Sequence, residues 1–125
     1  MGVQLAHPEL PVTCLSGDGS AMYSIQALCT AAHLNLPITF VITNNRSFRI
    51  LKQRLLGFHK NDNYLGMDFD NPEIDFAGIA RSLGVTAETV TDPDAIKPAL
   101  EAASQRKAPT LLDIIVEGNV RAVSK

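Results

Sequence analysis

An uncharged run, Ile38 to Thr43 (ITFVIT), constrains the fold of this 125-residue chain more than any other stretch. It consists of β-branched residues and one phenylalanine, which are the residue types enriched in strands. A strand without a charge on either face must be covered on both sides, and that is the usual environment of strands in a parallel sheet. Asn44 and Asn45 follow the run as typical turn residues. The run therefore predicts a buried strand of a parallel sheet.

Segments with strand-like and helix-like patterns alternate along the rest of the chain. Parallel strands need crossover connections, usually helices, so this alternation indicates a sheet with helices on both faces. We therefore predict an α/β fold with a three-layer, doubly wound and mostly parallel sheet. The expected strands are 12–16, 38–43, 85–90 and 110–117, and the expected helices are 20–34, 47–58, 71–83 or 75–83, and 93–106, with a surface loop over 59–71.

Two of the predicted helices have distinct apolar patterns. Apolar residues in 20–34 recur at helical spacing, with alanine on most other faces, so we expect that helix to be buried on nearly all sides. The helix over 47–58 is amphipathic, and it would bury Phe48, Leu51 and Leu55 on one face.

Charge and composition exclude several classes of function. The formal net charge is −2, which gives no electrostatic footprint for nucleic acid. The sequence shows no signal peptide and no apolar run near the ~18 residues of a membrane span. We expect a cytoplasmic protein with neither a nucleic-acid nor a membrane partner. Cys14 and Cys29 lie in apolar segments without metal-site spacing, so we expect reduced cysteines in the core.

A glycine-rich turn follows the first predicted strand. Gly17-Asp18-Gly19-Ser20 lies where that strand should end and a helix should begin. The two glycines permit positive φ and allow close approach to the backbone. Ser20 would lie at a helix N-terminus, where free N–H groups favour an anion such as phosphate. Asp18 does not suit phosphate alone, but it suits Mg²⁺, which is held by carboxyl or amide oxygens together with phosphate.

An amide oxygen is available at the end of the next strand. Asn45 follows the strand 38–43, and ligands of open parallel sheets bind beyond the carboxyl ends of the strands. Asp18 and Asn45 together would form half a site for a metal-bound diphosphate. Taken separately, a Gly-Asp-Gly turn and an Asn-Asn pair are both common loop sequences with a structural role only. The hypothesis therefore depends on both pieces lying at one edge of the same sheet.

Two other phosphate-binding motifs are excluded. A dinucleotide fingerprint needs a third glycine at position 22, where this chain has Met22, and an acid after the next strand, where it has Asn44. A P-loop needs Gly-Lys followed by Ser or Thr, and the sequence contains no such triplet.

The spacing of the two turns resembles that of a known family. Gly17-Asp18-Gly19, then 24 residues, then Asn44-Asn45 is similar to the thiamine-diphosphate motif of the decarboxylase and carboligase superfamily. The segments GDGSAMYSIQAL, VITNNRSF and PEIDFAGIARSLGV resemble the C-terminal cofactor domain of benzoylformate decarboxylase-like and acetolactate synthase-like enzymes. The similarity extends over residues 2–117. It implies a thiamine-diphosphate-binding fold, truncated at its N-terminus, with residues 1–125 as a single partial domain.

The resemblance also implies a metal site. Asp18 and Asn45 would bind Mg²⁺ through side-chain oxygens, and Ser47 would add its backbone carbonyl.

Contacts with thiamine diphosphate are implied in the same way. Gly19 and Ser20 would hold the diphosphate, and Phe48 and Leu51 would line the lower part of the cofactor pocket. The full set of implied cofactor-binding residues is Gly17, Asp18, Gly19, Ser20, Asn45, Ser47, Phe48 and Leu51.

The catalytic group of the family is expected outside this chain. In the superfamily, a glutamate that protonates the aminopyrimidine belongs to a separate domain, usually from a neighbouring subunit. The resemblance thus implies no catalytic residue here, an isolated chain without activity, a pyrimidine-binding domain as partner, and a homo-oligomer. In the complete enzyme, a 2-oxo acid would lose CO₂. Arg49 departs from the family's small residue; it could face solvent, which we favour, or meet an acidic substrate or a partner subunit.

Two alternatives stay open at this point. The chain could be the cofactor-binding small subunit of a two-subunit decarboxylase. It could also be a non-catalytic remnant that folds and self-associates.

Overall fold

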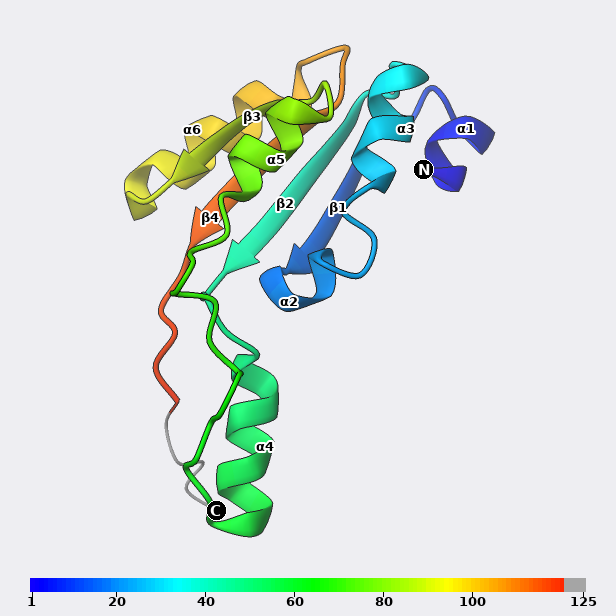
Figure 1. The fold of residues 1–125 in the computed structure, drawn as a ribbon. Coiled ribbons are helices and arrows are strands. Elements are labelled where there is room, and N and C mark those ends of the chain that lie inside the picture. Colours follow the sequence, from blue (N-terminus) through cyan, green and yellow to red (C-terminus); the bar gives the residue numbers. More distant parts are fainter. Residues whose placement is uncertain (121–125) are drawn as a thin grey trace.

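The computed structural model describes residues 1–120, which contain one four-stranded sheet. The strand order is β1-β2-β4-β3, and all three strand pairings are parallel (Figure 1). The predicted α/β fold with a parallel sheet is therefore confirmed. The strands are β1 (Val12–Gly17), β2 (Ile38–Asn44), β3 (Thr86–Val90) and β4 (Thr110–Ile115).

Helices cover both faces of this sheet. They are α1 (Gly2–Ala6), α2 (Asp18–Ala21), α3 (Ala27–His33), α4 (Arg49–His59), α5 (Phe76–Ser82) and α6 (Pro93–Ser104). On one face, side chains of α2, α3 and α5 pack with Ile42 and Leu111 in a buried cluster. On the other face, α6 packs over Val41 and Leu112. This arrangement makes the three predicted layers.

The two central strands are the most buried elements. Ile38 on β2 is 1% exposed and Leu112 on β4 is 0% exposed. The uncharged run 38–43 thus forms a buried strand as predicted, and the strand continues through Asn44.

The prediction of one buried helix over 20–34 is wrong. The segment forms the short helix α2, a run of turns over 22–26, and α3. Tyr23 is 82% exposed, and Cys14 and Cys29 are both exposed, so the expected core cysteines are also wrong. β1 is an edge strand, with a neighbouring strand on one side only, so Cys14 and the segment 22–26 beside it are less covered than a strand and helix over the centre of the sheet would be.

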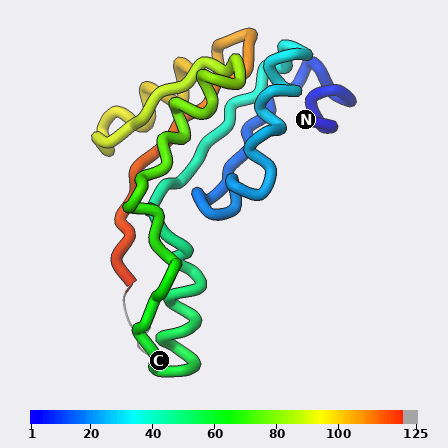
Figure 2. The backbone as a smooth tube through the Cα atoms, in the orientation of Figure 1, coloured from blue at the N-terminus to red at the C-terminus, as the bar shows by residue number. Residues whose placement is uncertain are grey.

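The helix α4 forms as predicted, but it buries a different face. It extends away from the sheet beyond the carboxyl ends of the strands, and the segment 60–75 runs beside it (Figures 1 and 2). Leu51 is 50% exposed, whereas Lys52 is 7% exposed and pairs with Asp68. Phe48 and Leu55 are half-buried, so the apolar stripe is only partly covered, and the most buried side chain of α4 is that of Lys52.

The remaining predicted elements are confirmed with small shifts. Asp75 caps α5 by accepting a hydrogen bond from the backbone N–H of Gly78 at 2.7 Å. Gly84 follows α5 with φ of 83°, a conformation that favours glycine. Among the described residues, no helix combines the length and apolar character needed to cross a bilayer.

Candidate functional site

A cleft of about 350 Å³ lies beyond the carboxyl ends of β1 and β2. Every residue predicted to bind cofactor or metal lines it, namely Gly17, Asp18, Gly19, Ser20, Asn45, Ser47, Phe48 and Leu51. Tyr23, Arg49 and Ile50 complete the lining. The two turns therefore lie at one edge of the same sheet, as the metal–diphosphate hypothesis requires.

The carboxylate of Asp18 joins the two strand ends. Its Oδ1 accepts a hydrogen bond from the backbone N–H of Gly19 at 2.8 Å. Its Oδ2 accepts from the backbone N–H groups of Asn45 at 3.0 Å and Ser47 at 3.2 Å. Asp18 is 2% exposed, so these bonds replace the water that a buried carboxylate loses. Asp18 thus determines where the turn after β2 lies.

The turn after β2 presents Asn45 to the cleft. Oδ1 of Asn45 accepts hydrogen bonds from the backbone N–H of Ser47 at 3.1 Å and from its Oγ at 2.9 Å. Arg46 between them has φ of 57°, which reverses the chain direction. The amide oxygen of Asn45 and the carboxylate of Asp18 are therefore held within one hydrogen-bonded network around Ser47.

The glycines of the first turn have different roles from those expected. Neither has positive φ, and Gly17 is extended with φ of −77°. Gly19 is required by close packing, because a Cβ there would lie 2.6 Å from Cε1 of Phe48. Phe48 in turn packs edge-on against Phe69, with ring centroids 4.6 Å apart. The prediction of close approach is confirmed at Gly19, and neither glycine adopts the positive φ that its residue type permits.

Ser20 lies on the exposed rim of the cleft. It is the third residue of the four-residue helix α2. A helix this short has only a small dipole, so the N-terminus of α2 would attract a phosphate less strongly than the N-terminus of a long helix. What Ser20 offers to an anion is its hydroxyl and its place beside Gly19.

Arg49 is oriented by the chain beyond β4. Its Nε donates to the backbone carbonyl of Asn119 at 3.2 Å, and it lines the cleft. This hydrogen bond is itself exposed, so the favoured expectation that Arg49 faces solvent stays a prediction, as do an acidic substrate and a partner subunit. The segment after β4 also touches the turn at Gly118, where a Cβ would lie 2.6 Å from the carbonyl oxygen of Asn45.

Two buried polar residues behind the cleft were missed by sequence reasoning. Asn44 is 2% exposed, and its Oδ1 accepts from the backbone N–H of Arg46 at 3.1 Å. Asp113 on β4 is 3% exposed and lies on the same face of the sheet as Asn44, one step further from the cleft. The available signal was that Asp113 is the only charged residue in 110–116.

The environment of Asp113 is unfavourable for its charge. Burial raises the pKa of its carboxyl; the polar side chain of Asn44 opposes that rise, and the nearby Asp75, Asp18 and Glu73 add to it. Its Oδ1 has no hydrogen-bond partner among the described residues.

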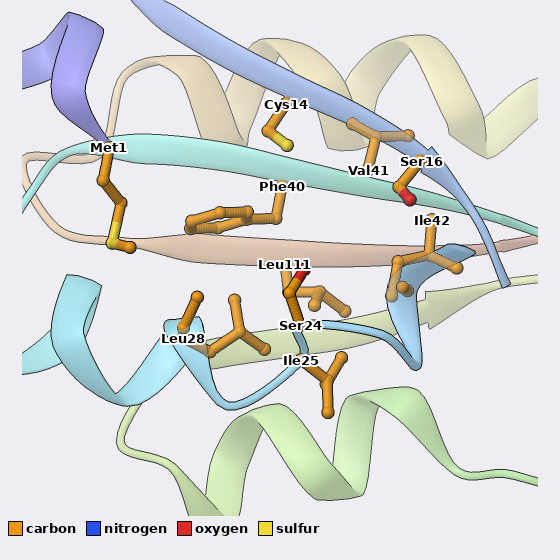
Figure 3. A pocket seen from close by; sticks show the side chains of 12 residues that line it. Met1, Cys14, Ser16, Ser24, Ile25, Leu28, Phe40, Val41, Ile42 and Leu111 are labelled. Carbon is orange, nitrogen blue, oxygen red and sulfur yellow. The ribbon is translucent and has the colours of Figure 1, made fainter. Parts of the chain in front are cut away.

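A second cavity lies away from the cleft. It measures about 190 Å³ and is enclosed by β1, β2 and the 21–28 segment, with Cys14, Leu28 and Phe40 among its lining (Figure 3). Its lining contains no charged side chain and none of the predicted site residues. This cavity cannot neutralise a diphosphate, so the cleft at the strand ends is the candidate site.

The chain matches one protein family over residues 1–114, described as "Thiamine pyrophosphate enzyme, C-terminal TPP binding domain". It is 39% identical over 121 residues to a Mycobacterium tuberculosis protein named as acetolactate synthase large subunit IlvX, covering 93% of this chain and 24% of that protein. It is 37% identical over 116 residues to the acetolactate synthase large subunit of Parasynechococcus marenigrum, covering 93% of this chain and 19% of that protein.

A solved structure shares the fold. The thiamine diphosphate-dependent 4-hydroxybenzoylformate decarboxylase of Rhodococcus jostii RHA1 superposes with a TM-score of 0.83 at 35% identity, covering 96% of this chain and 22% of that chain. The chain therefore spans about a quarter or less of the length of these relatives. With the family matched over almost all of its length, the chain belongs to the C-terminal TPP-binding domains of the thiamine pyrophosphate enzymes.

Proposed function

We propose that this chain binds thiamine diphosphate together with Mg²⁺, as the cofactor-binding part of a 2-oxo acid decarboxylase or carboligase of the benzoylformate decarboxylase or acetolactate synthase type. The observation that carries the proposal is the network in which buried Asp18 holds the turn containing Asn45 and Ser47. That network brings a carboxylate and an amide oxygen to the edge of one cleft.

The donor set fits Mg²⁺ paired with a diphosphate. Mg²⁺ prefers hard oxygens and is usually held by one or two protein groups, with water and substrate phosphates completing its shell. Asp18 would supply a carboxylate oxygen, Asn45 its amide oxygen and Ser47 its backbone carbonyl. Among the described residues no three His, Cys, Asp or Glu side chains cluster, which argues against a metal held by protein groups alone.

The rest of the cleft divides into a polar and an apolar part. Gly19 and Ser20 would receive the diphosphate through backbone N–H and hydroxyl groups, close to the charge of the metal. Phe48 and the half-exposed Leu51 would contact the apolar rings of the cofactor. When bound, thiamine diphosphate supplies carbanion-stabilising chemistry, and the residues of this chain anchor and orient it.

A pyrimidine-binding domain from another chain or segment would complete the active site with its acid/base glutamate. The 2-oxo acid substrate would enter between the two domains. We therefore expect the isolated chain to bind cofactor without turning over 2-oxo acids.

Isothermal titration calorimetry of the 125-residue chain with thiamine diphosphate tests the proposal. Adding MgCl₂ should tighten binding at least about tenfold, which corresponds to about 1.4 kcal/mol. Asp18→Asn should remove this dependence on Mg²⁺ because it removes the charge that the metal needs. It keeps one of the two oxygens that accept backbone N–H groups and turns an NH₂ group toward the others, so its fold is checked by circular dichroism.

Glu88→Gln is the matched control, since Glu88 is exposed on β3, away from the cleft. It should bind as the wild type does. A wild-type chain that binds no thiamine diphosphate at millimolar concentration with Mg²⁺, while folded by circular dichroism, would refute the proposal. Equal dependence on Mg²⁺ in wild type and Asp18→Asn would refute the metal assignment alone.

A further inference from the structure

The turn after β2 contains a residue in a strained backbone conformation. Arg46 has φ of 57°, in the left-handed region that a long side chain rarely adopts. The two other non-glycine residues described with positive φ, Asn35 and Lys60, follow α3 and α4, and helix ends commonly use this conformation. Arg46 lies at no helix end. Strain of this kind persists only where surrounding contacts hold it, and it is concentrated at binding and active sites.

Hydrogen bonds hold the backbone of Arg46 but not the carbonyl that precedes it. The N–H of Arg46 donates to Oδ1 of Asn44 at 3.1 Å, and its carbonyl accepts from the N–H of Phe69 at 2.8 Å. The carbonyl of Asn45 accepts no hydrogen bond from the described residues, and it lies against Gly118 in the chain beyond β4. Packing against Gly118 therefore limits where this carbonyl can point.

The contact at Gly118 leaves no room for a side chain. A Cβ there would lie 2.6 Å from the carbonyl oxygen of Asn45 and 3.7 Å from the carbonyl carbon. The first distance is shorter than the approach of a Cβ to another atom in folded proteins. Gly118 does not have positive φ. This contact, and not the backbone conformation, is what requires glycine at position 118.

The chain on both sides of Gly118 is tied to the cleft. The N–H of Val116 donates to the carbonyl of Asn44 at 2.9 Å, which extends the pairing of β2 with β4. The carbonyl of Asn119 accepts from Nε of Arg49 at 3.2 Å. Val116 and Asn119 are exposed, so burial of apolar surface does not explain the course of this segment.

The contact at Gly118 acts on the turn through one peptide plane. The C=O and N–H of a trans peptide point in opposite directions. The peptide that joins Asn45 to Arg46 thus has its oxygen against Gly118 and its N–H on Asn44. A side chain at position 118 would turn this plane, draw the N–H away from Asn44 and displace Ser47, which follows in the chain.

From this geometry we infer that Gly118 is a positioning residue for the proposed metal site. By leaving room for the Asn45 carbonyl, it keeps the strained turn 44–47 in the conformation that presents Asn45 and Ser47 to Mg²⁺ and the diphosphate. Its importance for cofactor binding rests on the proposed function, whereas its hold on the turn does not.

Amide hydrogen exchange by NMR, without ligand, tests the hold on the turn. In Gly118→Ala, the amides of Arg46 and Ser47 should exchange about tenfold faster, because the displaced peptide separates them from their acceptors. The amide of Leu112, on the central strand β4, should change by less than about threefold, because the loosening is local.

Gly57→Ala is the matched control. Gly57 is an exposed residue of α4, and no heavy atom lies within 4 Å of the Cβ that it would gain. The amides of Arg46 and Ser47 should exchange in this variant as they do in the wild type.

Calorimetry separates positioning from a general structural role. In Gly118→Ala, binding of thiamine diphosphate with MgCl₂ should weaken about tenfold, whereas binding without Mg²⁺ should be unchanged. The reason is that the turn carrying the metal ligands is displaced, while Gly19 and Ser20 are not. Equal weakening with and without Mg²⁺ would contradict the positioning role.

The inference is overturned by unchanged exchange at Arg46 and Ser47 in Gly118→Ala, by an equal increase at Leu112, by the same increase in Gly57→Ala, or by failure of Gly118→Ala to fold. A wild-type chain that binds no cofactor would contradict the proposed function alone. The exchange experiment contains no ligand and still decides whether Gly118 holds the turn.

Discussion

At the scale of single residues, Asp18 accounts for most of the geometry of the cleft. Three backbone N–H groups, from Gly19, Asn45 and Ser47, converge on its carboxylate. A buried N–H group without a partner costs about 1–3 kcal/mol, so removing this side chain disturbs both turns together. Asp18 is thus a structural anchor in addition to a proposed metal ligand, and the conservative change to Asn is the informative one.

The two glycines of the first turn give a paired prediction at this scale. Gly19→Ala should lower the free energy of unfolding by about 1–3 kcal/mol, because its Cβ would lie 2.6 Å from Phe48 and displace that ring. Gly17→Ala should be neutral or slightly stabilising, since no heavy atom lies within 4 Å of its Cβ and its φ of −77° suits alanine. Urea denaturation of the two variants measures the difference; equal losses would contradict the packing argument.

At the scale of elements, α4 and the segment 60–75 form one unit that depends on polar contacts. The segment forms backbone hydrogen bonds with the turn, from Phe48 N–H to the carbonyl of Met67 and from Phe69 N–H to that of Arg46. Lys52 adds the ion pair with Asp68. Because this unit carries Phe48 and Leu51, its stability sets the shape of the apolar side of the cleft.

Lys52→Met should loosen this unit. Lys52 is nearly buried, but the side chain of Asp68 is 45% exposed, so its remaining charge can be hydrated. We therefore expect a loss of about 1 kcal/mol, below the cost of breaking a fully buried pair. Limited proteolysis should cut 60–70 faster in this variant.

Lys97→Met on α6 is the matched control. Lys97 pairs with Glu101 at 3.9 Å with both side chains exposed, so its loss should change neither stability nor cleavage. Similar effects of the two substitutions would show that charge, and not the buried contact, holds the segment.

At the scale of the whole molecule, the sheet is covered unevenly. The side of β1 away from α3 has Leu15 at 70% exposed, and Tyr23 beyond the same strand is 82% exposed. β1 is also an edge strand, which leaves backbone groups available for pairing. We propose that copies of this chain associate through this edge, as exposed apolar surface favours.

Sedimentation velocity between about 10 and 500 μM should show association that increases with concentration. Leu15→Lys combined with Tyr23→Ser should shift the chain toward monomer, because a charge on an edge strand opposes pairing. Phe58→Ser, at the far end of α4, should leave association unchanged although Phe58 is 72% exposed. A monomeric wild type, or dissociation caused by Phe58→Ser alone, would contradict this interface.

Much of the fold and of the candidate site could be predicted from the order of residue types along the chain. The run 38–43 carries no charge on either face, so a strand of a parallel sheet could be predicted from it. The equally uncharged run of β1 also forms a parallel strand, but it is largely exposed. Gly-Asp-Gly and Asn-Asn came together because parallel strands share one carboxyl edge, a property of the topology class. The two ends of α5 could also be predicted, because each is determined by a nearby residue: Asp75 caps the N-terminus and Gly84 follows the C-terminus.

Only the tertiary structure decided which faces are buried. The exposure of Cys14 and the break in the helix over 20–34 follow from β1 lying at the edge of the sheet, and strand order is not encoded in local pattern. The same holds for Lys52, which is buried beside Asp68, 16 residues away, and for Asp113, which is buried because β4 is a central strand. Local sequence determines what an element can bury, and the packing of distant elements decides what it does bury.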